Sequence, residues 1–474
     1  MSRRLEGGSI ASRLVCSGCG AEPAAGDPYP FRCPNAGSGD GADHVLRREL
    51  EFDRLSFPPE GEELNPFVRY RKLLHPYHVA IANGFGDEEF CELVRVLDEQ
   101  VAGVDGRGFR VTPFRRHDAL SRELGFSVDG GVWVKNETGN VSGSHKARHL
   151  FGVLLQLEVA ERLGWVDPPA RRSLAIASCG NAALAAGVLA KAAGRALTVF
   201  VPPDANPAVT EQLRSLGAVT VTCARDGTTA GDPTYARLLG AIEDGALPFT
   251  CQGNLNALAV EGGMTIGYEI ASGIWAGGTT LDRLVVQVGG GALASACFES
   301  LADAKRLGRL GRVPRIDTVQ TQGAAPLRRA YEAVRARDGT GALAYAATHR
   351  AEFMWPWESE PKSIAHGILD DETYDWLAVC EGMLATGGSP LVVDESTLTD
   401  ANTLAQEATG IAVDPTGSAG LAGVLALRAA GELHPDERVA VLFTGITRVT
   451  GLHRDERSRD EKLPRQGHPV AQGV

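Results

Sequence analysis

From Gly131 onward, short apolar runs alternate with longer runs rich in Ala and Leu, and this alternation constrains the fold more than any other feature. The apolar runs are continuous in hydrophobicity, as expected of strands that are buried on both faces. We expect strands over 131–134, 173–178, 196–202, 218–223, 283–291, 316–321 and 438–445. Helices are predicted over 145–164, 182–194, 208–217 and 292–308, most of them ending at a Gly suited to a helix C-cap. Such alternation is typical of parallel α/β sheets.

Length and composition exclude several classes of protein. A chain of 474 residues is too long for one hydrophobic core and suits two or three packed units. The net charge of −12 argues against a nucleic-acid partner, because neutralising phosphates requires a basic surface. No run approaches the roughly 20 apolar residues of a membrane span, and the first residues lack the apolar core of a secretory signal. We therefore expect a cytoplasmic protein without a membrane partner.

The texture of the chain predicts five segments. They are a cysteine ribbon over 1–50, a helical arm over 51–110, a large α/β domain over 111–150 and 256–450, a small α/β domain over 151–255, and a flexible tail over 451–474. The first segment is too short and too polar to bury a core of its own, so it needs a staple. Residues 342–399 break the strand–helix rhythm and are expected to close over a site.

Cysteines in the first segment suggest a metal site. Cys16, Cys19 and Cys33 supply three thiolates, but Ala36 stands where a fourth cysteine would complete a second Cys-x-x-Cys pair. The fourth ligand could be His44, which we assign, or Asp40 or Asp43. The two readings that remain are a zinc site and a degenerate ribbon that has lost its metal. The other cysteines are isolated along the chain and are expected to be reduced.

Ligands of open parallel sheets bind beyond the carboxyl ends of the strands. A lysine lies beyond the carboxyl end of the first predicted strand. A Ser/Gly-rich turn leads from this strand into a helix, and Ser142 or Ser144 is expected to cap that helix. Lys146 then lies in the first turn, where the helix dipole disfavours a cation and favours a reactive neutral amine. The alternative is an ordinary solvated helix lysine.

Three further strand ends carry suitable residues. Backbone amides in the turn Ser178-Cys179-Gly180-Asn181 can bind a carboxylate, and the Asn181 amide can donate to a phenolate oxygen. The run Gly289-Gly290-Gly291-Ala292-Leu293 lets several N–H groups converge on a phosphate at a helix N-terminus. Thr444 follows the last strand and offers a hydroxyl to a pyridine nitrogen. Each of these turns taken alone is also compatible with simple packing.

In this order, the four motifs resemble those of the fold-type II pyridoxal-phosphate (PLP) enzymes, which are related to the tryptophan synthase β chain. The resemblance covers about residues 111–450. Within the group, the chain is most similar to threonine synthase in its segments 254–270 and 318–327, in Thr444, and in the N-terminal cysteines. The segments 289–293, 363–368 and 414–423 look more like those of the serine and threonine dehydratases.

Two motifs depart from the threonine synthase pattern. The usual Ser-Phe-Lys-Asp-Arg is Ser144-His145-Lys146-Ala147-Arg148, and the usual Thr-Gly-x-Gly-x-Lys is Thr444-Gly445-Ile446-Thr447-Arg448. The replaced residues lie near the distal group of the family's substrate, so the sequence does not favour phosphohomoserine.

The resemblance implies a PLP-dependent lyase of amino-acid metabolism that performs β/γ-elimination or replacement on a small amino acid, as a homodimer. Lys146 would carry the cofactor and act as the base, and Thr444 would bond the ring nitrogen without holding a proton there. The remaining roles are a donor to the phenolate oxygen (Asn181), phosphate binding (Gly289, Gly290, Gly291, Ala292 and Leu293) and substrate binding (Ser178 and Gly180). The alternatives are a threonine or serine ammonia-lyase, a specialised amino-acid synthase, and a cofactor-binding regulatory protein.

Overall fold

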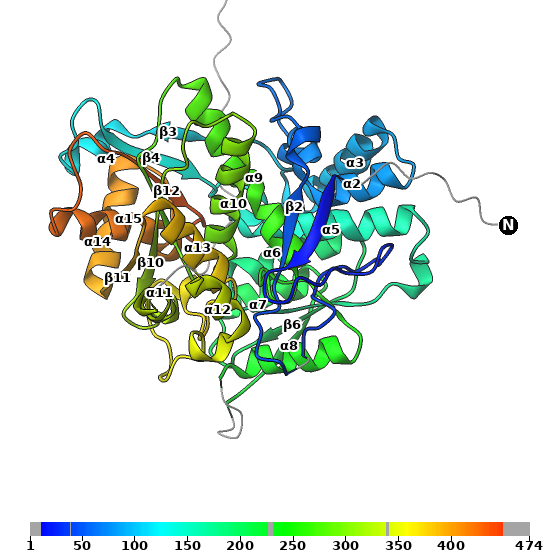
Figure 1. The fold of residues 1–474 in the computed structure, drawn as a ribbon. Helices are drawn as coiled ribbons and strands as arrows, with labels where there is room; N and C mark the ends of the chain where they lie inside the picture. Colours follow the sequence, from blue (N-terminus) through cyan, green and yellow to red (C-terminus); the bar gives the residue numbers. More distant parts are fainter. Residues whose placement is uncertain (1–10, 38, 226–230, 338–340, 449–474) are drawn as a thin grey trace, which may run out of the picture.

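Two sheets organise the molecule (Figure 1), which is a computed structural model that describes residues 11–37, 39–225, 231–337 and 341–448. The larger sheet has the strand order β11-β10-β9-β12-β4-β3, and only the β3–β4 pair is antiparallel. The smaller sheet has the order β7-β6-β5-β8 and is entirely parallel. The predicted fold class, α/β with two parallel sheets, is confirmed.

The large sheet contains β3 (Phe114–Arg116), β4 (Gly131–Asn136), β9 (Arg283–Gln287), β10 (Arg315–Thr321), β11 (Pro390–Val393) and β12 (Arg438–Phe443). The small sheet contains β5 (Leu174–Ala177), β6 (Leu197–Val201), β7 (Val219–Thr222) and β8 (Leu247–Pro248). Every strand that we expected is present. The sequence did not predict three strands of these two sheets, β3, β8 and β11, because they have two to four residues and carry too little apolar periodicity to be recognised.

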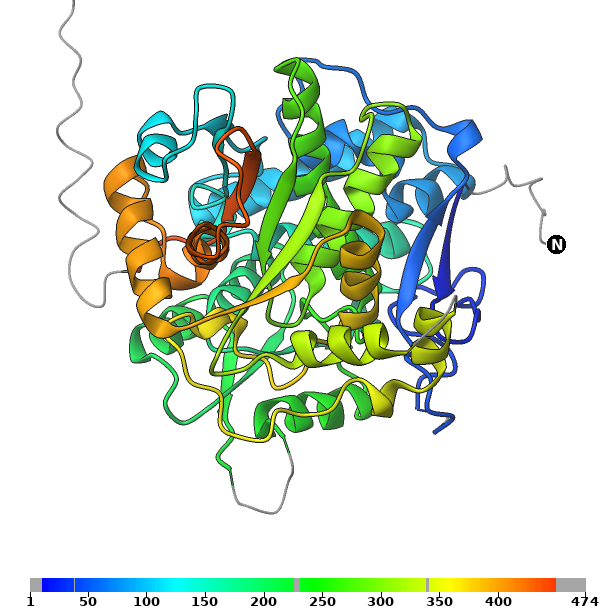
Figure 2. The same ribbon diagram turned by 60° about the vertical axis from the view of Figure 1, so that its left-hand side comes forward.

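The helices are α1 (Pro66–Arg69), α2 (His75–Ala82), α3 (Asp87–Asp105), α4 (Asp118–Glu123), α5 (Lys146–Arg162), α6 (Asn181–Ala192), α7 (Pro207–Ser215), α8 (Pro233–Glu243), α9 (Ala257–Ala276), α10 (Ala292–Arg306), α11 (Pro326–Ala336), α12 (Ala342–Thr348), α13 (Trp376–Thr386), α14 (Glu395–Thr409) and α15 (Pro415–Ala429). Helices cover both faces of the large sheet, as Figure 2 shows. Leu284 and Val286 of β9 pack in one apolar cluster with α10 and α13, whereas Val285 packs in another with α14 and α15. The strand is therefore buried on both faces, as its continuous apolar run predicts.

Helices α5 and α9 pack closely beside the large sheet. A Cβ atom at Gly152 of α5 would lie 2.7 Å from the Cα atom of Gly262 in α9, so two facing glycines allow this approach. The close contact fixes the position of α5, whose first residue is Lys146.

The N-terminal part begins with the antiparallel pair β1 (Ser12–Cys16) and β2 (Leu46–Leu50). The segment predicted as a helical arm, 51–110, contains α1, α2 and α3 in succession, and α3 packs against α6. The domain boundaries stay a prediction, and the tail at 451–474 lies outside the described residues. Within the described part of the chain, no helix combines the length and the hydrophobicity needed to cross a bilayer.

Candidate active site

Lys146 is the first residue of α5, in the strand–turn–helix position that the sequence predicts. The expected cap is wrong: His145 occupies the N-cap position, and neither Ser142 nor Ser144 caps the helix. Ser142 is instead left-handed, with φ of 54°, the one positive φ outside glycine in the described residues. The buried hydroxyl oxygens of both serines have no hydrogen-bond partner among the described residues. Because such an orphan costs about 1–3 kcal/mol, the pair marks a place where a polar ligand fits.

Buried ion pairs fix α5 immediately after Lys146. Arg148 Nε lies 2.8 Å from Glu137 Oε2, and Arg148 Nη1 lies 2.5 Å from Glu269 Oε1 on α9. Lys135 of β4 also pairs with Glu269. All four side chains are at most 1% exposed. The two cations and two carboxylates compensate each other, so the turn that carries Lys146 is anchored from inside the protein.

Thr444 lies directly beside the lysine turn. His145 N–H donates to the Thr444 carbonyl over 3.0 Å, and Ile446 N–H donates to the Gly143 carbonyl over 2.9 Å. The Thr444 hydroxyl oxygen accepts a 3.0 Å hydrogen bond from Gln287 Nε2, which leaves the hydroxyl hydrogen able to donate elsewhere. Gln287 was not among the site residues predicted from the sequence. The feature that could have identified it is a polar side chain at the end of an otherwise apolar, buried run of β9.

The Gly-rich run forms the loop between β9 and α10, and Gly291 has a φ of 100° that favours glycine. A carboxylate lies against this loop, because a Cβ atom at Gly289 would meet Asp370 Oδ2, and one at Gly290 would lie 3.9 Å from Asp370 Cγ. Burial raises the pKa of Asp370 to about 6, while Lys146 nearby opposes the rise. A carboxylate oxygen thus occupies the position where an oxyanion at a helix N-terminus would bind. Asp370 was not predicted.

Asn181 is the first residue of α6, and its side chain is held on two sides. Its Nδ2 donates to Asp414 Oδ2 over 3.3 Å, and its Oδ1 accepts from Arg448 Nη2 over 3.0 Å. A Cβ atom at Gly445 would lie 2.6 Å from Asn181 Nδ2, so this side chain also meets the turn after β12. Burial raises the pKa of Asp414 to about 6. The structure thus brings the second and fourth motifs together.

Ser178 and Gly180 lie half-buried in the turn between β5 and α6. The Gly180 N–H points to the Ser178 hydroxyl oxygen, at 3.4 Å. Cys179 between them is exposed. These positions are at the carboxyl edge of the small sheet, where parallel α/β sheets bind ligands.

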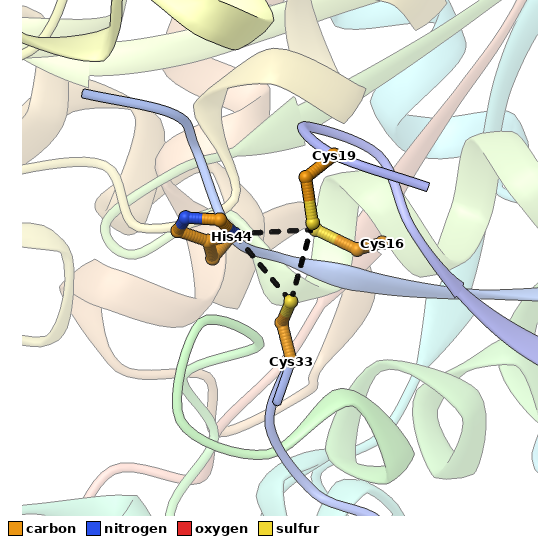
Figure 3. A group of neighbouring side chains, drawn as sticks. All are labelled: Cys16, Cys19, Cys33 and His44. Carbon is orange, nitrogen blue, oxygen red and sulfur yellow. Dashed lines mark hydrogen bonds between the residues drawn. The ribbon is translucent and has the colours of Figure 1, made fainter. Parts of the chain in front are cut away.

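The N-terminal cysteines gather around His44 (Figure 3). His44 Nδ1 is 3.7 Å from Cys16 Sγ and 3.4 Å from Cys33 Sγ, and the Cys19 and Cys33 sulfurs are 3.6 Å apart. Tetrahedral zinc with sulfur and nitrogen ligands spaces their atoms by about 3.5–3.8 Å. Asp40 contacts the other nitrogen of His44 over 2.9 Å, and Asp43 turns to Arg350. Of the three alternatives for the fourth position, His44 is the one that joins the cysteines.

Comparison with known proteins places this arrangement in a family. The family model described as "Pyridoxal-phosphate dependent enzyme" matches residues 107–445, which include all four strand-end motifs. The chain belongs to this family. It is 24% identical over 337 residues to the threonine synthase of Methanocaldococcus jannaschii, a match that covers 70% of this chain and 74% of that protein. It is 27% identical over 343 residues to the cysteate synthase of Methanosphaerula palustris, covering 69% of this chain and 73% of that one.

Solved structures of the family share the fold. Maize serine racemase superposes with a TM-score of 0.54 at 18% sequence identity, covering 74% of this chain and 92% of that one. The protein is accordingly a PLP-dependent enzyme of fold type II, and its curated relatives include threonine synthase and cysteate synthase.

The residues of the site fit the cofactor that this family implies. A glycine loop at a helix N-terminus that lies against a carboxylate oxygen suits a phosphate, and the orphaned hydroxyls of Ser142 and Ser144 offer further hydrogen bonds beside Lys146. The hydroxyl of Thr444 is oriented as a donor by Gln287, which suits an unprotonated ring nitrogen.

Proposed function

We propose that this protein catalyses β/γ-elimination or replacement on a small amino acid, in the manner of threonine synthase. The observation that carries the proposal is the contact of Thr444 with both the lysine turn and Gln287. It supports a site in which an amine and a neutral hydroxyl donor, from opposite ends of the matched region, serve one cofactor.

PLP, when bound, supplies an electron sink that stabilises negative charge at the α-carbon of an amino acid. Lys146 binds the cofactor and moves the proton at the substrate's α-carbon, because its amino group lies at the start of a helix that the buried ion pairs hold still. The N–H groups of Gly289, Gly290, Gly291, Ala292 and Leu293 bind the phosphate at the start of α10.

Asn181 donates to the phenolate oxygen of the cofactor, and Asp414 with Arg448 sets the orientation of its amide. Ser178 and Gly180 bind the substrate carboxylate from the turn that directly precedes Asn181. Thr444 donates to the ring nitrogen as a neutral group, which limits the charge drawn into the ring. Loss of a leaving group is therefore expected to outrun transamination.

A threonine or serine ammonia-lyase is the second candidate. The dehydratase-like segment 414–423 supports it, because Asp414 caps α15 and also contacts Asn181 at the site. In this candidate, water completes the reaction and a ketoacid is released. We keep the homodimer as a prediction from the resemblance.

We also propose that Cys16, Cys19, Cys33 and His44 bind a structural zinc ion. Asp40 Oδ1 lies 2.9 Å from Nε2 of His44 and can accept its hydrogen, which supports this assignment, since metal-binding histidines commonly donate their other N–H group to a carboxylate.

The decisive assay measures ketoacid and amino-acid products from the purified protein and a panel of amino acids with β or γ leaving groups. We expect turnover of at least one of them by the parent and by Lys191→Ala, which removes an exposed lysine of α6, and none by Lys146→Ala. Turnover by Lys146→Ala equal to that of Lys191→Ala would refute the catalytic assignment. Absence of turnover in the parent, together with tight PLP binding, would favour the cofactor-binding regulatory protein.

A further inference from the structure

The segment from 366 to 375, which joins η6 (His366–Ile368) to α13, lies directly on the Gly-rich loop. Asp375 N–H donates to the Gly290 carbonyl over 2.9 Å. A Cβ atom at Gly290 would lie 3.0 Å from the Tyr374 ring, and one at Gly291 would lie 3.0 Å from the Thr373 methyl group. The loop is therefore glycine-rich partly because this segment packs against it.

Asp370 is the member of this segment whose charge meets the loop. Its Oδ2 occupies the place that a side chain at Gly289 would take, and its Cγ atom lies 3.9 Å from the position of a Cβ atom at Gly290. The N–H groups of this loop, at the start of α10, are the donors that the proposed function assigns to the phosphate. A phosphate and a carboxylate cannot share them without strong like-charge repulsion.

We propose that Asp370 is an internal anion that competes with the cofactor's phosphate for the Gly289–Gly291 loop and so sets how tightly PLP binds. The inference rests on the proposed function, because it takes the loop to be the phosphate site. In the protein without cofactor, the carboxylate lies against the loop. When the phosphate binds, Asp370 withdraws or takes up a proton.

The surroundings of Asp370 determine how its charge responds to pH. Its pKa lies at about 6 because burial raises it, with Asp232 and Asp371 adding to the rise and Lys146 opposing it. The groups that face it from the packed elements are Lys146 of α5, Asp232 at the start of α8, the adjacent Asp371, Cys179 after β5, Cys251 after β8, and Tyr374. Competition should therefore weaken as the pH falls through this range, since a neutral carboxyl repels the phosphate less.

The test compares Asp370→Asn with Asp371→Asn in the full chain stripped of cofactor. Asp370→Asn keeps the shape of the side chain but removes its charge, and Asp371→Asn removes the neighbouring charge without touching the loop. PLP affinity is measured by absorbance titration, and affinity for inorganic phosphate by thermal shift. We expect Asp370→Asn to bind both about tenfold more tightly at neutral pH, because the competing negative charge is removed, and Asp371→Asn to stay within about twofold of the parent.

The ratio of parent to Asp370→Asn dissociation constants should also shrink as the pH falls below about 6. Unchanged or weaker PLP binding by Asp370→Asn, or a ratio that is constant with pH, would overturn the proposal. Circular dichroism of each variant without cofactor reports folding, and Asp370→Ser repeats the test if the asparagine variant does not fold.

Gly290→Asp separates this inference from the proposed function on which it rests. If Gly290→Asp abolishes PLP binding while Asp370→Asn leaves it unchanged, the loop is the phosphate site and only the competition fails. If Gly290→Asp leaves PLP affinity unchanged, the assignment of the loop fails and the competition fails with it.

Discussion

Two clusters of polar side chains lie in different parts of this molecule, one around α5 and one in the N-terminal ribbon. They differ in whether their charges are neutralised by other groups of the protein. Around α5, two carboxylates face two cations, all buried, so the charges compensate within the protein. In the ribbon, three thiols and one imidazole converge. Thiolates at such distances would repel each other unless a metal ion lay between them. The comparison teaches that the turn carrying Lys146 is anchored by the protein's own charges, whereas the zinc site that we propose in the ribbon would draw its stability from the metal ion.

The largest expected effect comes from breaking the self-satisfied cluster. Arg148→Leu leaves Glu137 and Glu269 with Lys135 as their remaining cation, so we expect the free energy of unfolding to fall by about 3–5 kcal/mol. Urea denaturation of the parent and the variant measures this loss. The control is Arg95→Leu, which removes an exposed pair with Glu88 and should cost at most about 1 kcal/mol. An equal decrease in the free energy of unfolding of both variants would contradict a role of the buried ion pairs in anchoring α5.

Metal removal tests the other cluster. We expect one zinc ion per chain by elemental analysis, and a chelator should lower the Tm by about 5 °C because the ribbon loses its staple. Cys19→Ser should start at the lower Tm and show no response to the chelator. Cys179→Ser changes an exposed cysteine outside the group and should behave as the parent. A parent protein that contains no zinc and ignores the chelator would instead identify a degenerate ribbon.

A smaller effect, on kcat, is expected at Gln287, which lies at the end of β9 and orients the Thr444 hydroxyl. Gln287→Leu removes the donor to the Thr444 hydroxyl oxygen, so kcat should fall by about tenfold, the value of one hydrogen bond. Gln156→Leu is the matched control, because Gln156 of α5 is fully buried and its side-chain amide has no partner among the described residues. Steady-state kinetics that show equal kcat for both variants would contradict a positioning role for Gln287.

The smallest effect is expected for Thr444→Ser, which keeps the hydroxyl and should change kcat by no more than about threefold.

Thr444→Asp at the same position serves as the contrasting variant. It should strongly reduce the rate of elimination or replacement and should raise transamination, since a carboxylate favours a protonated ring nitrogen. Product analysis separates the two reactions. If Thr444→Val matched the parent in activity, cofactor affinity and products, the threonine would be only structural.

The strand-end rule accounts for how much of the site the sequence could predict. Lys146, Asn181, the Gly-rich loop and Thr444 each follow a strand with a continuous apolar run, and parallel strands place these residues at adjacent sheet edges. Local pattern could not predict Gln287, Asp370 or Arg448 as members of the site, because each is brought there by a contact with a residue distant in the chain. The expected serine cap failed for a related reason. The turn pairs with residues 444–446, and this tertiary contact decides its backbone.

The ribbon shows the reverse case, in which local spacing was informative. Cys16, Cys19 and Cys33 could be recognised from the sequence with His44 as the assigned fourth ligand, and the side-chain directions bring His44 to the cysteines while Asp40 and Asp43 face other partners. The segment over 342–399 was expected to close over a site, and residues 366–375 do lie on the Gly-rich loop. The hydrophobic periodicity of the sequence could predict neither its short strand β11 nor the position of Asp370.

Borohydride reduction of the protein loaded with PLP, followed by peptide mass spectrometry, tests the central assignment most directly. Reduction fixes the cofactor covalently on the lysine that binds it. The account predicts the modification on Lys146, at the start of α5, and its absence, together with the visible absorbance of the bound cofactor, in Lys146→Ala. A reduced adduct on any other lysine of the parent protein would contradict the account.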